Sequence, residues 1–366
     1  TLTGDCEFDA VTVSNGDTFN VNGQRAEFSG TFTATGTITG TGYWYFTGSG
    51  TLAIGGGASW THDATAIVQQ GTSTDTISLR DSNAVGTVFY NQPSVQMNTT
   101  SHRMGRQHIV GAGTWGFTST ATGTTTDLTV ATGGTLLEAD ASTISVAGDF
   151  TTSGGLLGAS CYNFDSSNDY NANTASFDFR TSAPSYTWEV WLKPDAVNVS
   201  ARLIQQNNIG LLAITNQTLK FYPNWDVEIL TGNVIPTANK WYHVACSWNH
   251  STNTASIYVD GKLVKQATDS TADKTGSAAF YFGRRDNGTA EWDGYMDEIR
   301  FWSDVRTEAE IRANMFTEVA ADAAGLAHQW SLNEGTGTTS EDTCSNTTDQ
   351  DLTVVAGGWA GAGTFT

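Results

Sequence analysis

Three segments of the chain combine aromatic rings with amide and carboxylate groups, which is the chemistry that sugar recognition requires. A pyranose ring has one apolar face and a rim of hydroxyl groups, so its binding site needs a ring surface with polar groups beside it. The segments are QQNNIG at 205–210, FYPNWDVE at 221–228 and RRDNGTAEWDG at 284–294. The candidate ligand-binding residues are Tyr222, Asn224, Trp225, Asp226, Asp286, Asn287 and Trp292. Two alternatives stay open: a contact with another protein, which uses the same residue types, and simple packing of the two tryptophans over a sheet edge.

No motif for catalysis accompanies these segments. The sequence contains no GxSxG elbow, no HExxH pair and no phosphate-binding loop. The adjacent carboxylates Asp297 and Glu298 are expected to point to opposite faces of a strand, so they do not form a glycosidase pair. We therefore expect that the protein is not an enzyme.

Oxygen ligands for a metal ion gather in two segments. Asp165, Asn168 and Asp169 occur in FDSSNDY at 164–170, and Asp297 begins the DEIRFW run of a later strand. Calcium binds six to eight oxygens from carboxylates and backbone carbonyls. The alternative for aspartates at the end of a strand is that they cap turns through their own backbone.

The elements that must position these residues are strands. TWEVWLKP at 187–194 and KWYHVACSWN at 240–249 alternate between two faces, with Trp188, Val190 and Leu192 on one side of the first segment. Two stacked sheets would bury such rows. The pair Asp260-Gly261 predicts a two-residue hairpin turn. RTEAEIRANMF at 306–316 predicts one short helix with a capping box of Thr307 and Glu310.

These segments occur in a series that resembles the laminin-G-like and concanavalin A-like lectin family. The series is NFDSSNDY at 163–170, TWEVWLKP at 187–194, KWYHVACSWN at 240–249, ASIYVDGKLV at 255–264, YMDEIRFWSDVRTEAEIRANM at 295–315 and LAHQWSLNEGTGTT at 326–339. The resemblance implies an antiparallel jelly-roll β-sandwich that binds sugars or proteins. It also implies a structural calcium ion between the two acidic segments, with Asp165, Asp169 and Asp297 as ligands. Because the segments around Cys161 and Cys344 tend to lie close in this family, it further implies a disulfide between them and an oxidising environment.

The N-terminal half has a different character. Residues 1–157 contain no Lys, and short runs of Thr, Val and Phe are separated by Gly, as in VTVSNGDTFNVNG at 11–23 and LTVATGGTLLEAD at 128–140. Short strands with Gly at the corners are typical of stacked rungs, and this pattern resembles segments of phage fibres, phage spikes and surface adhesins. We expect an all-β chain: a β-solenoid-like or otherwise β-rich stem over 1–157, followed by the sandwich over 158–366. A Thr-rich β-sandwich is the alternative for the first part.

The net charge of the chain bears on which classes of partner it can bind. The 366 residues include 37 Asp and Glu but only 17 Lys and Arg, which gives a formal net charge of −20. This charge argues against binding to nucleic acid or to an anionic membrane surface, and no apolar run is long enough to insert into a membrane. An acidic surface suits an extracellular setting.

Two classes of function follow from these features. The first is a structural or adhesive protein of a virus particle (a fibre, spike or capsid decoration) or of a cell surface. Its lectin-like tip would bind glycans or neighbouring subunits, and its stem would self-associate or contact other structural subunits. The alternative is a carbohydrate-binding module of a secreted enzyme or scaffold.

Overall fold

The computed structural model describes most of the chain. The described ranges are 1–47, 52–54, 59–69, 74–78, 87–97, 102–103, 107–117, 122–125, 127–131, 134–137, 143–146, 150–152, 155–166, 168–177, 184–207, 209–225, 228–268, 270, 278–360 and 364–365. The chain divides into two compact units. Unit 1 comprises Thr1–Leu156 together with Ala362–Thr366, and unit 2 comprises Leu157–Gly361. Unit 1 therefore includes the last residues of the chain, which the predicted division assigns to the second domain.

Unit 1 consists of short β-strands. These are β1 (Cys6–Phe8), β2 (Val11–Val13), β3 (Thr18–Asn20), β4 (Arg25–Phe28), β5 (Phe32–Ala34), β6 (Thr37–Phe46), β7 (Leu52–Ile54), β8 (Ser59–Gln69), β9 (Thr74–Ser78), β10 (Thr87–Met97), β11 (His102–Arg103), β12 (Gln107–Phe117), β13 (Thr122–Thr125), β14 (Asp127–Val130), β15 (Gly134–Leu137), β16 (Thr143–Val146), β17 (Phe150–Thr152) and β34 (Thr364–Phe365).

Strands of unit 1 pair in parallel with strands that come later in the sequence. In two of the pairings, Cys6 lies opposite Ala26 and Thr87 lies opposite Gln107. Because of this register, equivalent side chains stack on one another. The rings of Phe8, Phe28 and Phe46 form one such stack, with centroids 5.5 and 5.0 Å apart. Parallel stacking of successive segments is the pairing that stacked rungs require and supports a solenoid-like stem, which stays an interpretation.

The C-terminal strand belongs to this parallel arrangement. The chain leaves unit 1 after β17, and β34 later pairs in parallel with β15 through Thr135 with Thr364 and Leu136 with Phe365. No pattern in the sequence indicated this pairing.

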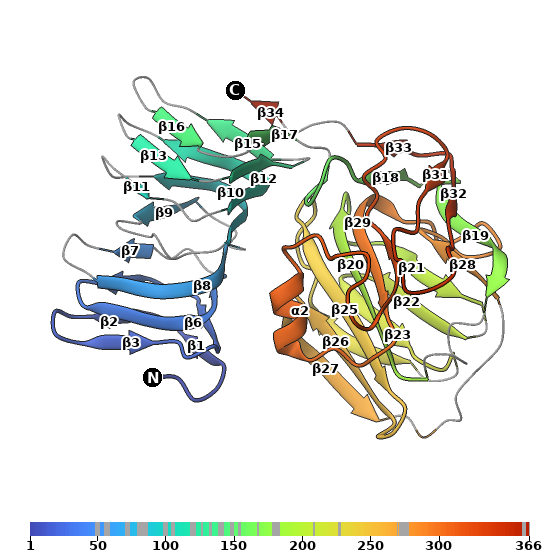
Figure 1. Cartoon of the computed structure of the whole chain (residues 1–366), viewed down its shortest axis with the longest axis horizontal. Coiled ribbons are helices and arrows are strands. Elements are labelled where there is room, and N and C mark those ends of the chain that lie inside the picture. The colour runs from blue at the N-terminus through green and yellow to red at the C-terminus, as the bar shows by residue number, and fades with distance from the viewer. Residues whose placement is uncertain are drawn as a thin grey trace. The chain divides into compact units, whose positions relative to one another are not determined.

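The described residues of unit 2 form two antiparallel sheets and one helix. Its elements are β18 (Tyr162–Asp165), β19 (Tyr170–Phe177), β20 (Tyr186–Pro194), β21 (Ser200–Gln206), β22 (Gly210–Thr215), β23 (Thr218–Tyr222), β24 (Ile229–Asn233), β25 (Tyr242–Asn249), β26 (Thr254–Val259), β27 (Lys262–Thr268), β28 (Ala278–Phe282), β29 (Asp293–Trp302), α2 (Glu308–Asn314), β30 (Leu326–Trp330), β31 (Thr339–Ser340), β32 (Leu352–Val355) and β33 (Gly358–Trp359). The first sheet has the order β27-β26-β25-β20-β29-β18-β33, with β30 beside β29, and the second has the order β24-β23-β22-β21-β28-β19-β32-β31 (Figure 1).

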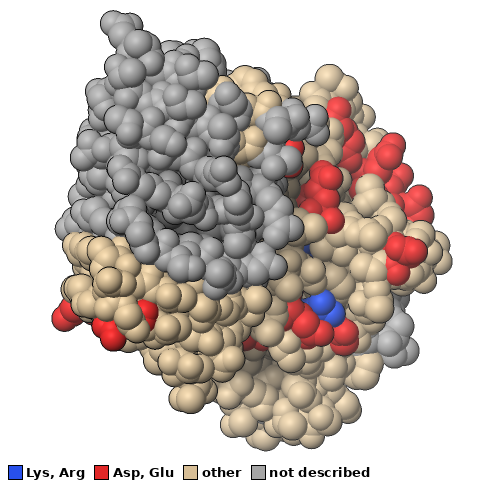
Figure 2. Space-filling view, turned by 60° about the vertical axis from the view of Figure 1, so that its left-hand side comes forward, with Lys and Arg blue, Asp and Glu red and all other residues tan. Residues whose placement is uncertain are grey.

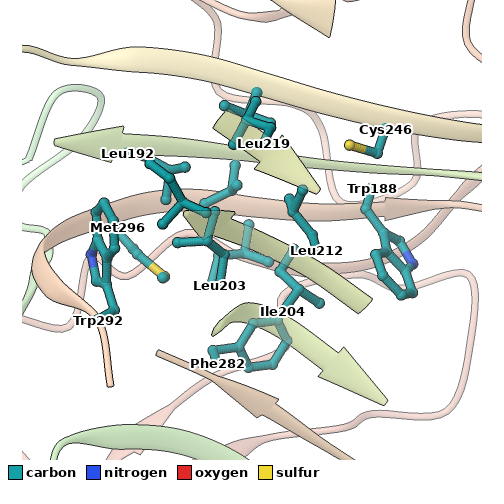
Figure 3. Packing of buried hydrophobic residues seen from close by; sticks show 14 of the residues in the cluster. Trp188, Leu192, Leu203, Ile204, Leu212, Leu219, Cys246, Phe282, Trp292 and Met296 are labelled. Atoms are coloured by element: carbon teal, nitrogen blue, oxygen red, sulfur yellow. The ribbon is translucent and has the colours of Figure 1, made fainter. Parts of the chain in front are cut away.

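Apolar side chains from both sheets fill the space between them. Trp188, Val190 and Leu192 are buried there, as the alternation in β20 predicts. Leu192 and Met296 of the first sheet meet Leu203 of the second (Figure 3). The jelly-roll β-sandwich that the sequence predicts is confirmed.

Local structure in the first sheet follows the sequence closely. Asp260 and Gly261 both have positive φ, 48° and 69°, as a two-residue turn of the primed kind requires. Thr307 caps α2, and both hydrogen bonds of the predicted capping box with Glu310 are present. Ile311 of the helix packs on Ala245 and Tyr258, so α2 covers part of the outer face of the first sheet.

The predicted disulfide between Cys161 and Cys344 is wrong, because the two side chains have different surroundings. The thiol of Cys344 donates to the Leu326 carbonyl at 3.5 Å and packs beside Trp302. Cys161 instead lies near Lys193 and Tyr295. Cys246 is fully buried, and burial raises the pKa of its thiol.

Acidic side chains are scattered over the surface, and basic ones are rare on the face shown in Figure 2. Among the described residues, no helix has both the length and the apolar character needed to cross a membrane.

Candidate functional site

The outer face of the second sheet brings several candidate sugar-binding groups together. A β-bulge in β21 makes this possible, because the pairing of β21 with β22 shifts between Arg202 and Ile204. Leu203 and Ile204 consequently both enter the core, while Arg202 and Gln205 both belong to the outer face.

One cross-strand row on this face carries two tyrosines. Tyr281 of β28 lies opposite Gln205 of β21, Gln205 lies opposite Leu211 of β22, and Leu211 lies opposite Tyr222 of β23. Residues opposite each other on neighbouring strands point to the same side. The two tyrosines are partly exposed, whereas Gln205 and Leu211 between them are buried. The row therefore offers two partly exposed aromatic rings, with the buried Gln205 and Leu211 between them.

A second row beside it carries positive charge. Arg202 lies opposite Ala213, which lies opposite Lys220, which lies opposite Leu230. Leu230 is 42% exposed, which is unusual for so large an apolar side chain. Burial, and then the neighbouring charge of Arg285, lower the pKa of the Arg202 guanidinium. This row therefore adds cationic donors and an apolar surface to the tyrosine row.

The loop after β28 closes one side of the tyrosine row. Asp286 accepts hydrogen bonds from the Asn207 amide at 2.8 Å and from the Gln205 amide at 3.3 Å. Arg285 lies 3.9 Å from the same carboxylate. The predicted segments 205–210 and 284–294 thus meet through their polar side chains.

A carboxylate also stands at the other end of the row. Glu228 accepts a hydrogen bond from the Tyr222 hydroxyl and lies 3.5 Å from the Lys220 ammonium group. The hydroxyl of Tyr222 is thereby fixed at the edge of the site.

Near Tyr281, an arginine extends the aromatic surface. The Arg284 guanidinium lies 3.4 Å from the centroid of the Tyr170 ring, and the rings of Tyr170 and Tyr281 are 6.2 Å apart. Arginine stacked on an aromatic ring keeps donors available at the edge of that ring.

The structure separates the sequence-predicted ligand residues into two groups. Tyr222, Asp286, Asn287 and Trp225 are partly or fully exposed, and Asn287 accepts a hydrogen bond from Thr289 at 2.7 Å. Trp292 is wrong as a ligand residue, because its side chain is fully buried in the core beside Met296 (Figure 3).

Two further predicted residues do not contribute an accessible group. Asn224 is completely buried, so it is also wrong as a ligand residue. Asp226 lies outside the described residues.

Arg202, Asn207, Glu228 and Tyr281 were not among the predicted site residues. Glu228 and Asn207 do occur in the aromatic and amide segments noted in the sequence, which was the signal available. Arg202 and Tyr281 lie inside alternating strands, so only the pairing of strands shows that they face the site.

Asp165 and Asp169 adjoin at the turn between β18 and β19. Asp169 is buried, and one of its carboxylate oxygens accepts a hydrogen bond from the Asp165 backbone N–H at 2.5 Å. Burial and the nearby Asp165 raise the pKa of Asp169. Its second oxygen has no hydrogen-bond partner within the described ranges. A buried carboxylate oxygen without a donor suits a cation, so these two residues fit half of the expected calcium site.

Asp297 does not share that site. Asp165 lies opposite Asp293, and Asp297 is four residues further along β29, about 13 Å away at the usual rise of a strand. Its neighbour Met296 points into the core, so Asp297 points to the outer face, where it accepts a hydrogen bond from the Leu157 backbone at 3.1 Å. No group of three or more His, Cys, Asp or Glu residues within the described part of the chain is arranged to hold a metal ion. The expected set of three calcium ligands is therefore wrong for Asp297.

Comparison with known protein families gives one match. Residues 165–312 match the model of the concanavalin A-like lectin/glucanases superfamily. The matched range lies within unit 2, whose sandwich has the fold that the sequence resemblance predicts. No curated protein matches the chain.

Solved structures similar to the chain include two carbohydrate-binding proteins and a pentraxin. A proposed carbohydrate binding protein from Bacteroides ovatus is 22% identical over 56% of this chain and 61% of its own, with a TM-score of 0.44. A SAP-like pentraxin from Limulus polyphemus is 12% identical over 42% of this chain and 79% of its own, with a TM-score of 0.36. The CBM40 of a Ruminococcus gnavus sialidase, solved with α2,3-sialyllactose, is 14% identical over 38% of this chain and 90% of its own, with a TM-score of 0.31. The chain spans less than two thirds of the Bacteroides protein.

Proposed function

We propose that the outer face of the second sheet of unit 2 binds glycans without catalysing a reaction. The row that contains Tyr281 and Tyr222 carries this proposal, because it presents two partly exposed aromatic rings with a carboxylate at each side. An aromatic surface can stack on the apolar face of a sugar, while Asp286 and Glu228 can accept hydrogen bonds from its hydroxyl groups.

The test is binding of the full chain to a glycan array, followed by calorimetry with the best ligand. The matched variants are Tyr281→Ala in the row and Leu263→Ala in β27 of the first sheet, where Leu263 is 37% exposed. We expect Tyr281→Ala to weaken binding and Leu263→Ala to leave it unchanged. Absence of glycan binding, or an equal loss of affinity in both variants, would contradict the proposal.

We further propose that the whole protein is an extracellular structural or adhesive component of a virus particle or a cell surface. The parallel strand stacking of unit 1 supports this, because such an arrangement makes a stiff stem that can carry a lectin-like unit. A carbohydrate-binding module of a secreted enzyme or scaffold would use the same site in unit 2. Light scattering of the full chain separates the two classes: self-association into a defined oligomer supports the structural role, and a monomer at all concentrations contradicts it.

Calcium is proposed as a structural ion at Asp165 and Asp169. The buried oxygen of Asp169 without a donor, next to a second carboxylate, supports this. When bound, calcium would offset the repulsion between the two carboxylates and fix the turn between β18 and β19.

A further inference from the structure

The outer face of the second sheet differs in charge from the protein as a whole. The chain contains 37 acidic and 17 basic residues, yet Arg202, Lys220, Arg284 and Arg285 gather around the two tyrosines of the proposed glycan site. The carboxylates whose charges act on Arg202 are Asp286 and Glu228. A local group of cations on so acidic a protein calls for a specific explanation.

Both carboxylates are already engaged with other partners. Asp286 binds the amides of Gln205 and Asn207 and lies near Arg285. Glu228 binds the Tyr222 hydroxyl and lies near Lys220. These contacts place the two carboxylates beside Lys220 and Arg285 and balance the charges of those two residues.

Arg202 differs from these two cations. Among the described residues its guanidinium makes no ion pair within 4 Å, although its side chain is only partly exposed. Its cross-strand neighbour is Ala213, whose side chain carries no charge to pair with Arg202. A partly desolvated cation that makes no close ion pair is unfavourable in the protein alone.

We propose that the glycan bound at this face carries a negatively charged sugar, whose acidic group pairs with Arg202. The proposal rests on the glycan-binding function and adds the ligand class to it. A guanidinium presents two parallel N–H donors that match the two oxygens of a carboxylate or of a sulfate. Tyr222 and Tyr281 would stack on neutral sugars of the same glycan, while Arg202 would pair with its acidic group.

The test compares acidic glycans with neutral counterparts that differ only by the acidic group. Suitable probes are α2,3-sialyllactose against lactose, a uronate-containing disaccharide against its neutral analogue, and lactose sulfated at the 3 position. We expect at least one acidic probe to bind about tenfold or more tightly than its neutral partner, which is the usual effect of one charged hydrogen-bonded contact. The uronate and sulfate probes distinguish a carboxylate from a sulfate as the source of the charge.

Two substitutions assign the effect to Arg202. Arg202→Gln is expected to remove the preference for the acidic probe and to leave the affinity for the neutral one within about twofold. Lys265→Gln is the matched control, because Lys265 is an exposed cation on β27 of the first sheet, away from the site. It is expected to change the preference by less than about threefold.

The outcomes separate the inference from the function on which it rests. Glycan binding without any preference for acidic probes overturns the inference and leaves the binding function standing. Equal losses for acidic and neutral probes in Arg202→Gln also overturn it, because Arg202 would then support the site only as a structural residue. No binding to any glycan overturns both.

Discussion

Tyr281 and Tyr222 lie in one cross-strand row, with the two strands β21 and β22 between them. Three strand spacings separate them, which is about 14 Å. One sugar ring cannot reach both rings over that span. The site therefore fits an oligosaccharide that extends across the strands.

This separation leads to a prediction about ligand length. We expect a tri- or tetrasaccharide to lose about three- to tenfold in affinity on either Tyr222→Ala or Tyr281→Ala, as aromatic contacts usually contribute. A monosaccharide should respond to one of the two substitutions and not to the other. Calorimetric titration of the same variants with sugars of increasing length checks this. Equal responses of the monosaccharide to both substitutions would contradict a site that spans the strands.

Calcium binding at Asp165 and Asp169 predicts a ligand-dependent change in thermal stability. A cation at 100 times its dissociation constant adds about 2.7 kcal/mol to the free energy of unfolding. We expect calcium to raise the melting temperature of the wild-type protein and a chelator to reverse this. Asp169→Asn should abolish the calcium effect.

Asp297→Asn is the control for that experiment, because Asp297 lies about 13 Å along β29 from Asp293, the residue opposite Asp165. It should leave the calcium-induced shift intact. If Asp297→Asn removes the shift and Asp169→Asn does not, the calcium ion is bound elsewhere. If calcium leaves the melting temperature of every form unchanged, the proposed ion is wrong.

The buried pair of Arg300 and Glu298 predicts a large loss of stability on breaking it. Arg300 binds Glu298 at 2.6 Å and the carbonyls of Asn314 and Thr317, so it ties the segment after α2 to the first sheet. Arg300→Met leaves a buried charge without its partner and should cost about 3–5 kcal/mol in urea unfolding.

Two further variants make the origin of that loss clear. Replacing Glu298 as well as Arg300 by Met should recover much of the stability, because no unpaired charge remains. Lys220→Met removes a half-exposed pair with Glu228 and should cost less than about 1 kcal/mol. An equal cost for Arg300→Met and Lys220→Met would show that burial of the first pair has little effect.

The cysteines predict a distinct pattern of chemical labelling. All four should react with a thiol reagent in denaturant, since Cys161 and Cys344 do not pair with each other. In the native protein, Cys6 should react first because it is partly exposed. Cys246 should react last, because its burial raises the pKa of the thiol. Peptide mass spectrometry after alkylation identifies the sites, and a Cys161–Cys344 disulfide peptide would contradict the structure.

Local features of unit 2 were predictable because they depend on neighbours in sequence. The alternation of Trp188, Val190 and Leu192, the turn at Asp260-Gly261 and the cap at Thr307 each involve only a few consecutive residues. Physical rules for strands, turns and helix caps apply directly to such segments.

The site was harder to predict because it depends on register between distant strands. The bulge at Leu203 decides that Arg202 and Gln205 share a face, and only the pairing of β28 with β21 brings Tyr281 into the row. Trp292 misled the prediction because its neighbours in sequence are polar, although its ring enters the core. Asp297 misled the prediction because the two acidic segments do lie side by side. The residue opposite Asp165 is Asp293, however, and not Asp297.

The pairing of β34 with β15 means that the two ends of the chain both belong to unit 1, and that unit 2 is inserted between them. A pulling force applied at Thr1 and at Phe365 would therefore be carried by the parallel strands of unit 1. The lectin-like sandwich would bear no tension until β34 detaches.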